Sequence, residues 1–166
     1  MKNLPAVRFL MRILVNPGWA PLGVVAMHLV LAEFGLTQRF DHLLHFTGGA
    51  AMAWFLFGLI ALLPFQVTGV PKWVHHLIAF SSACTVAVFW EFAEFASDQL
   101  LGTAIQQSLS ETVLDLLFGV LGAGATLLMA AAFSMLVRGV APENPAHQGT
   151  TPDGNSGATE GPPSVN

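Results

Sequence analysis

Ionisable side chains gather at the ends of three apolar segments, and their types are those that bind metal ions or transfer protons. The first of these segments begins with Asp41, His42 and His45. The other two contribute only carboxylates, at Glu91, Glu94, Asp98, Glu111 and Asp115. Carboxylate oxygens together with one or two imidazole nitrogens suit zinc, manganese or iron better than calcium or magnesium. A metal held there would activate water, with a spare carboxylate as the general base.

Helical spacing places these side chains on shared faces. Asp41 and His45 are four residues apart, and residues so spaced are neighbours on a helix. Small residues, which let helix backbones approach closely, continue the same faces. They are Gly49, Ala53, Cys84, Ala87, Gly119, Gly122 and Thr126. We therefore expect the ionisable faces to turn toward one another and to form one polar pocket about one helical turn below the membrane surface.

The negative charges of these carboxylates need compensation from another source, because no Lys or Arg stands among them. An ionised carboxylate at the centre of a bilayer costs about 2.5–3.5 kcal/mol on insertion scales. Glu91 lies about 7 Å inside the end of its expected helix, at roughly 1.5 Å per residue. Such a pocket must bind a cation, share protons or hold water.

Three interpretations of the pocket remain open. In the first, a divalent metal such as zinc is bound, and Glu94 is the catalytic acid/base. The expected metal ligands are then Asp41, His42, His45, Glu91 and Asp115. In the second, the same carboxylates form a path for protons or other cations. In the third, they are an interhelical hydrogen-bond network in a structural subunit of a larger membrane complex.

The composition indicates the environment in which these residues lie. Of the 166 residues, 54% are apolar and only 10% are charged, whereas a typical soluble domain has about 25% charged residues. So little charge cannot cover a water-soluble surface. The six Lys and Arg residues also exclude a nucleic-acid binder, because they form no basic stripe.

Four apolar stretches approach the roughly 20 residues that a transmembrane helix needs. They are residues 19–36, 43–64, 73–96 and 112–137. The predicted fold is an all-α integral membrane bundle of four transmembrane helices, formed by residues 17–140. Residues 1–16 form an N-terminal segment before the bundle. Residues 141–166, rich in Pro, Gly, Ser and Thr, are predicted to be a disordered tail.

Basic residues predict the orientation in the membrane. One side would carry Lys2, Arg8, Arg12, Lys72 and Arg138, against Arg39 on the other. We therefore expect a bacterial inner-membrane protein with both termini in the cytoplasm and the polar pocket facing outward.

Residues 4–15 are expected either to lie in the interface as an amphipathic helix or to begin the first span. The lipid bilayer is the expected partner, together with an envelope lipid or another membrane protein.

Several of these residues also resemble a known family. The stretch Asp41-His42-Leu43-Leu44-His45-Phe46 resembles the Asp-x-x-x-His-Phe opening of a span in VanZ-like proteins and in the inner-membrane family that includes YjdF. The stretch from Ser108 to Leu117, followed by Gly119 and Gly122, resembles the final span of these families. Glu91 and Glu94, ahead of Gln106 and Gln107, resemble the Glu and Gln of the preceding span. The resemblance covers roughly residues 37–125.

The sequence also departs from these families. Gln106 and Gln107 stand where VanZ-like proteins often have an Arg, Gly119 stands where they commonly have Asn, and Glu111 replaces the first Asp of the YjdF pattern. VanZ is linked to glycopeptide-antibiotic resistance, but neither group has an agreed biochemical activity. The resemblance therefore implies a bacterial membrane location but no reaction. It also marks five residues of the pocket, Asp41, His45, Glu91, Glu94 and Asp115.

Overall fold

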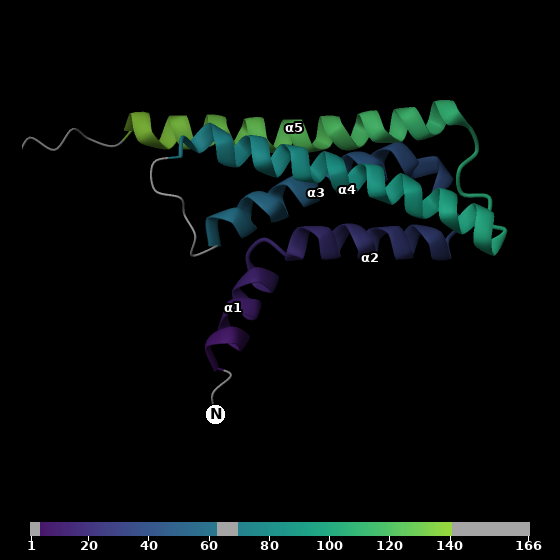
Figure 1. Ribbon diagram of the computed structural model, residues 1–166, viewed down its shortest axis with the longest axis horizontal. Coiled ribbons are helices and arrows are strands. Elements are labelled where there is room, and N and C mark those ends of the chain that lie inside the picture. The colour runs from purple at the N-terminus through teal and green to yellow at the C-terminus, as the bar shows by residue number, and fades with distance from the viewer. Residues whose placement is uncertain (1–3, 63–69, 141–166) are drawn as a thin grey trace, which may run out of the picture.

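The computed structural model describes residues 4–62 and 70–140, and every regular element in that part of the chain is helical (Figure 1). The elements are α1 (Leu4–Val15), α2 (Trp19–Glu33), the 3-10 helix η1 (Gln38–Phe40), α3 (Asp41–Leu62), α4 (Lys72–Leu101) and α5 (Leu109–Val140). The predicted all-α fold is confirmed. The predicted disordered tail, residues 141–166, lies outside the described residues.

Three helical segments are long and apolar enough to cross a membrane. They are Gln38–Leu62, Lys72–Leu101 and Leu109–Val137. The first predicted span, residues 19–36, is shorter than expected, because α2 has 15 residues and reaches only about 22 Å at 1.5 Å per residue. It meets the same criterion only together with α1, from which it is bent by 60°. The described chain therefore has three spans, or four if this bent pair is one.

Local backbone signals explain why α2 ends before Leu36. Gly35 adopts a left-handed conformation with a φ of 64°. The N–H of Gly35 donates to the carbonyl of Ala32, and the N–H of Leu36 donates to the carbonyl of Leu31. These two bonds form a Schellman motif, which ends a helix at a glycine.

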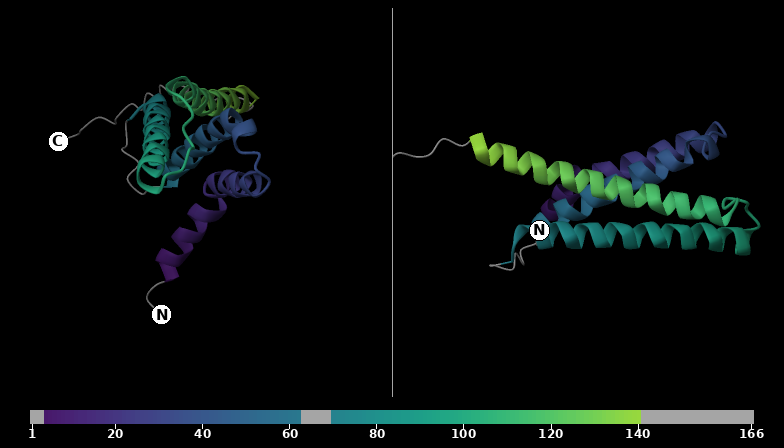
Figure 2. Two further views of the ribbon diagram at one scale, coloured as in Figure 1. Left: turned by 90° about the vertical axis from the view of Figure 1, so that its right-hand side faces the viewer. Right: turned by 90° about the horizontal axis from the view of Figure 1, so that it is seen from above.

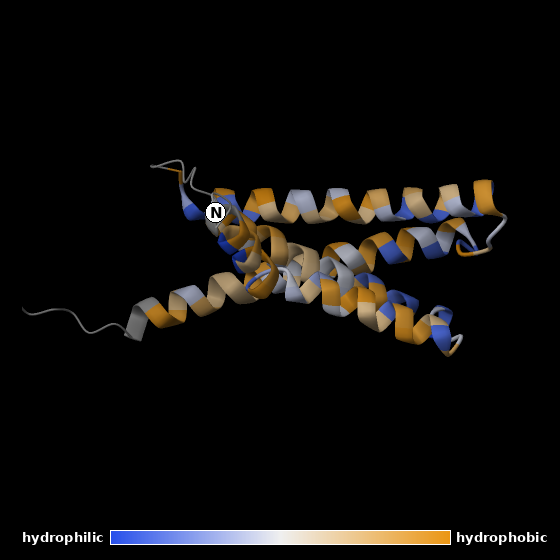
Figure 3. Ribbon diagram, turned by 90° about the horizontal axis from the view of Figure 1, so that it is seen from below, coloured by the Kyte–Doolittle hydropathy of each residue, from blue (hydrophilic) through white to orange (hydrophobic). Residues whose placement is uncertain are grey.

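The surface of the bundle is apolar and its interior is built from small residues. A cluster of buried residues forms the core, and its members are Ala53, Ala79, Ala83, Ala123 and Leu127. Large side chains such as Phe89, Leu128 and Phe133 are 64–73% exposed, and hydrophobic residues dominate the helices in Figure 3. This distribution is expected of a protein whose outer surface contacts lipid.

Helix α3 lies at the centre of the bundle and packs against α2, α4 and α5, as Figure 2 shows. Its backbone touches that of α5 at two glycines. A Cβ atom on Gly49 would collide with the backbone of Gly119, and one on Gly122 would collide with the backbone carbonyl of Phe46. The predicted role of small residues is therefore confirmed here, since only glycine permits these contacts.

Helix α1 is a separate helix, and the chain turns between it and α2 at Pro17 and Gly18, which are both buried. Pro17 packs against Gly58 of α3. Arg8 and Arg12 on α1 are exposed. These features match an amphipathic helix that leaves the bundle, while its position in the membrane interface stays a prediction.

Candidate metal centre

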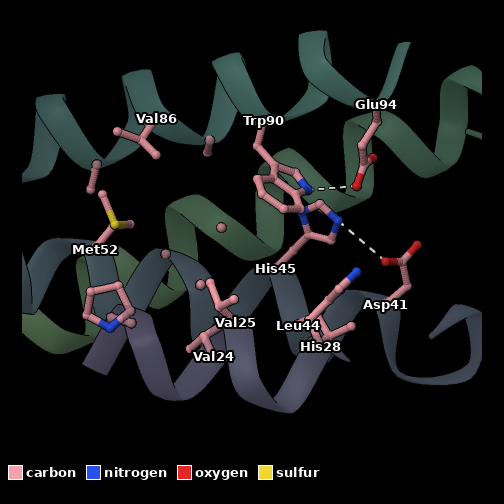
Figure 4. Close-up of a pocket in the computed structure, with 17 residues that line it drawn as sticks. Val24, Val25, His28, Asp41, Leu44, His45, Met52, Val86, Trp90 and Glu94 are labelled. Atoms are coloured by element: carbon pink, nitrogen blue, oxygen red, sulfur yellow. Dashed lines mark hydrogen bonds and ion pairs between the residues drawn. The ribbon is translucent and has the colours of Figure 1, made fainter. Parts of the chain in front are cut away.

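The three helix ends that carry the ionisable residues meet at one end of the bundle, as predicted. Helix α3 begins there, α4 ends there, and α5 begins there after the connection of residues 102–108 (Figure 1). The close-up in Figure 4 shows His45 between Asp41 on one side and Trp90 of α4 on the other. Residues more than 70 positions apart in the sequence thereby share one site.

The imidazole of His45 is the centre of the site, because carboxylates from three helices surround it. Its Nε2 lies 3.5 Å from Asp41 Oδ1 and 4.0 Å from Asp115 Oδ1. Its Nδ1 lies 3.5 Å from Glu91 Oε1. The side chains of His45, Glu91 and Asp115 are 9%, 5% and 6% exposed. These three side chains are therefore shielded, whereas the side chain of Asp41 is 37% exposed. The distances around His45 exceed the 2.7–3.2 Å typical of hydrogen bonds.

His42 differs from His45, since it forms a hydrogen bond with a single carboxylate, that of Asp115. Its Nδ1 lies 2.8 Å from Asp115 Oδ1, which is hydrogen-bonding distance. Its ring stacks on Phe118 with 4.9 Å between the ring centroids and 10° between the planes. The structure thus places His42 behind Asp115, where it orients that carboxylate.

Glu91 is buried and only partly satisfied. Gln106 Nε2 donates to Glu91 Oε2 at 3.2 Å and to the Glu91 backbone carbonyl at 3.1 Å. Glu91 Oε1 is buried and has no hydrogen-bond partner among the described residues. A buried carboxylate oxygen without a partner is costly, so this oxygen needs a proton or a cation near it.

Asp98 organises the α4–α5 connection instead of joining the centre. Its carboxylate accepts hydrogen bonds from the Thr103 hydroxyl at 2.6 Å, the Ile105 N–H at 2.8 Å and the Gln106 N–H at 2.9 Å. These bonds bring the Gln106 side chain to Glu91. Glu111 also lies outside the centre, at the first turn of α5, where the Ser108 hydroxyl accepts its N–H at 3.2 Å.

Replacing Asp98 with alanine is expected to loosen this connection, because three hydrogen bonds to residues 103–106 are lost. Hydrogen–deuterium exchange measured by mass spectrometry should show the amides of Ile105 and Gln106 exchanging several times faster than in the wild type. The neighbouring exposed residue supplies the control, since Gln99→Ala should leave these amides unchanged. Equal exchange in the two variants would contradict the role given to Asp98.

Glu94 lies across a cavity from Asp41 and is held by a tryptophan. The indole N–H of Trp90 donates to Glu94 Oε1 at 2.7 Å, as Figure 4 shows. The four-residue spacing of Trp90 and Glu94 was a signal in the sequence for this pair. Asp41, His45 and Glu94 all line this cavity, whose volume is about 280 Å³. Glu94 and Asp41 are thus the two carboxylates in position to meet a molecule inside the cavity.

Two groups of three side chains are close enough to hold a metal ion, and both contain His45. The first is Asp41, His45 and Asp115, and the second is His45, Glu91 and Glu94. In each group the ligand atoms lie within 4.8 Å of one another. The structure therefore brings together five of the six predicted site residues, and the sixth, His42, contacts Asp115.

Comparison with known proteins is consistent with a membrane protein. A relative from Thermotoga maritima, described as "Uncharacterized protein", is 34% identical over 103 residues, which are 59% of this chain and 53% of the relative. The chain thus spans about half the length of that curated relative. No solved structure matches the chain.

A family model described as "Predicted membrane protein (DUF2238)" matches residues 17–135. The match extends over α2, α3 and α4 and most of α5, and it includes every residue of the candidate metal centre. The chain therefore belongs to this family of predicted membrane proteins, DUF2238.

Proposed function

We propose that the protein binds one divalent metal ion between Asp41, His45 and Asp115, with an open coordination position facing the cavity. Three protein ligands and one open position are the usual arrangement of catalytic zinc sites. The ion would supply Lewis acidity and would favour ionisation of bound water. Glu94 would serve as the general acid/base, held in place by Trp90. The function proposed is that of a metal-dependent envelope protein.

The environment of His45 is the observation that carries this proposal. Ligand atoms bound to zinc at about 2.0–2.2 Å lie roughly 3.3–3.6 Å apart in a tetrahedron. The 3.5 Å separation of His45 Nε2 from Asp41 Oδ1 falls in that range, and the 4.0 Å separation from Asp115 Oδ1 is slightly longer. They are too long for hydrogen bonds and so leave room for an ion.

The residues around these ligands support the same choice. A metal-bound histidine usually donates its other N–H to a carboxylate or carbonyl, and metal-bound carboxylates are also hydrogen-bonded. His42 bonds to Asp115 at 2.8 Å, whereas Glu91 Oε1 lies 3.5 Å from the other nitrogen of His45 and would accept its N–H only after a small approach. Glu91 and His42, predicted as ligands, are therefore proposed as partners that orient the ligands. This pattern favours the first group of three over the group of His45, Glu91 and Glu94.

Electrostatics also favour a bound cation. Asp115 and Glu91 are each only 4% exposed. In the part of the chain that the structure describes, no Lys or Arg forms an ion pair with either of them. A divalent ion would compensate the charges of Asp41 and Asp115 and would reduce the repulsion between neighbouring carboxylates.

A path for protons or cations across the membrane has less support. Such a path needs polar groups along the whole bundle. Beyond the centre, the described core consists of Ala53, Ala79, Ala83, Ala123 and Leu127. A purely structural network remains the contrasting outcome, and the metal content of the protein tests it.

Elemental analysis by inductively coupled plasma mass spectrometry tests the proposal. Protein purified in detergent without an affinity tag, after loading with zinc, manganese or iron(II) and dialysis, is expected to retain about one equivalent of one of these ions. Protein that retains none of the three would exclude the proposed function and would favour the structural network.

The location and family of the protein complete the proposal. We place it in the bacterial inner membrane, with the centre at the outer face. In support, Lys72 begins α4 at the opposite end of the bundle, whereas Arg39 lies at the same end as the centre. The VanZ-like and YjdF-like character stays part of the proposal. It rests on the Asp41–Phe46 stretch, on the Ser108–Leu117 stretch with the glycines that follow it, and on Glu91 and Glu94 ahead of Gln106 and Gln107.

A further inference from the structure

We propose that the centre binds a membrane phospholipid, which enters sideways between α2 and α4. One hydrocarbon chain would lie in the apolar cavity, and the headgroup would lie beside Asp41 and Glu94. This inference rests on the proposed function for its chemistry, since the phosphate oxygens would approach the ion between Asp41, His45 and Asp115. It adds the class of molecule and the route by which that molecule reaches the site.

The cavity below the centre has the lining that a hydrocarbon chain requires. Apart from the ionisable residues and Trp90 at its polar end, its walls are made of apolar or small residues. These include Val24, Val25, Leu44, Gly48, Met52 and Val86. Its volume of about 280 Å³ is close to twice the roughly 150 Å³ of an apolar cavity that holds a benzene ring. The space therefore fits part of a hydrocarbon chain.

The cavity opens toward lipid through a gap between α2 and α4. Val25 of α2 and Val86 and Trp90 of α4 line it, yet they are 50%, 36% and 47% exposed. Figure 4 shows these two helices on opposite sides of the cavity. Helix α2 packs mainly against α3. Its described contacts with α4 include an edge-on approach of the His28 and Trp90 rings at the polar end of the cavity, with 6.2 Å between the ring centroids. A mouth with exposed valines on both sides faces the bilayer, whose chains are the molecules available to fill it.

A second, more polar cavity of about 470 Å³ continues from the first toward the end of the bundle. Four residues line both cavities, namely His28, Asp41, Trp90 and Glu94. Polar side chains that belong only to the second cavity include Thr37, Gln38 and Ser97. An apolar space joined to a polar space at the ionisable residues matches the division of a lipid into chain and headgroup.

The charges at this junction indicate the kind of headgroup. Among the residues that the structure describes, no Lys or Arg lines either cavity, so Asp41 and Glu94 would repel a phosphate unless the ion met it. The carboxylate of Glu94 is suited to an amine or hydroxyl donor. Phosphatidylethanolamine has both features, a phosphate and an amine, and is therefore the lipid chosen to test the site.

Photolabelling in lipid nanodiscs tests this inference. The probe is phosphatidylethanolamine with a diazirine in one acyl chain, and labelled residues are located by mass spectrometry. Met52 lines the cavity, whereas Phe89 is 64% exposed and outside it. In the wild type we expect label at both residues, with Phe89 reporting lipid at the outer surface.

Gly48→Leu is the variant designed to fill the cavity. Gly48 lines the cavity, and a Cβ atom on it meets nothing within 4 Å. The introduced side chain would occupy the space of the lipid chain, so label at Met52 is expected to fall at least about fivefold. Gly23→Leu is the control, since Gly23 also has open space around it but lies outside the cavity. Label at Phe89 should be unchanged in both variants.

Label at Phe89 without label at Met52 in the wild type would overturn the inference. So would equal labelling of Met52 in folded Gly48→Leu and Gly23→Leu. If Gly48→Leu does not fold, the ratio of label at Met52 to label at Phe89 in the wild type still decides whether a lipid chain enters the cavity. The metal content of the same samples separates the two proposals: a labelled but metal-free wild type refutes the metal centre alone, and a metal-bound wild type without label at Met52 refutes the lipid site alone.

Discussion

Replacing His45 with alanine is expected to abolish stoichiometric metal binding while the helices remain folded. His45 supplies the nitrogen ligand between Asp41 and Asp115, and no other imidazole lies within reach of both carboxylates in the described residues. Two carboxylates alone bind zinc weakly compared with a site that includes imidazole. We expect the dissociation constant for the ion to rise by more than the roughly 10–100-fold that loss of an outer partner costs.

Two further histidines make this measurement specific. His75→Ala is the matched control, because His75 lies in the first turn of α4 at the other end of the bundle. It should bind the ion as the wild type does. His42→Phe keeps an aromatic ring against Phe118 and removes the bond to Asp115. That variant should weaken binding by about 10–100-fold, as expected for a residue that orients a ligand.

Isothermal titration of each metal-free variant with zinc or manganese gives these constants, and circular dichroism reports whether the helices persist. Unchanged affinity in His45→Ala would rule out the ligand set proposed here. A loss of equal size in His75→Ala would show that the binding is not confined to the centre.

Gly49→Ala and Gly48→Ala are expected to change stability in opposite directions, although they make the same substitution at adjacent positions of α3. A Cβ atom on Gly49 would collide with the backbone of Gly119, whereas one on Gly48 meets nothing within 4 Å. Because backbone cannot move aside as a flexible side chain can, α3 and α5 must separate in Gly49→Ala. Overpacking of this kind lowers the free energy of unfolding by about 1–3 kcal/mol or more.

Gly48→Ala should instead raise the free energy of unfolding by up to about 1 kcal/mol, because alanine is the better helix former. Reversible unfolding in mixed micelles with increasing denaturing detergent, followed by circular dichroism, gives both values. Gly122→Ala should resemble Gly49→Ala, since its Cβ would collide with the backbone carbonyl of Phe46. Equal stability of the Gly48 and Gly49 variants would contradict the close contact of α3 with α5.

The metal centre depends on this same contact. Gly49 lies one turn beyond His45 on α3, and Gly119 lies one turn beyond Asp115 on α5. The approach of the two glycines therefore brings His45 Nε2 within 4.0 Å of Asp115. A variant that separates α3 and α5 is expected to lose metal affinity as well as stability.

Much of the architecture could be predicted from local patterns in the sequence. Apolar stretches predicted the three long spans, which the structure places at Gln38–Leu62, Lys72–Leu101 and Leu109–Val137. The length of α2 was overestimated, because hydropathy continues through Phe34 and Leu36 although Gly35 ends the helix. Hydropathy reports where a segment prefers to lie and contains no information about a left-handed glycine.

The sequence by itself determined that this is an all-α membrane protein and that its carboxylates and histidines share helix faces. It could do so because spacing on a helix and burial in lipid are local properties. Only the tertiary structure decided that His45 is the centre, that His42 orients Asp115, and that Asp98 brings Gln106 to Glu91. It also decided that an apolar cavity lined by residues of α2 and α4 reaches the site. These features depend on distances between helices, and such distances are set where backbones meet, as at Gly49 and Gly119.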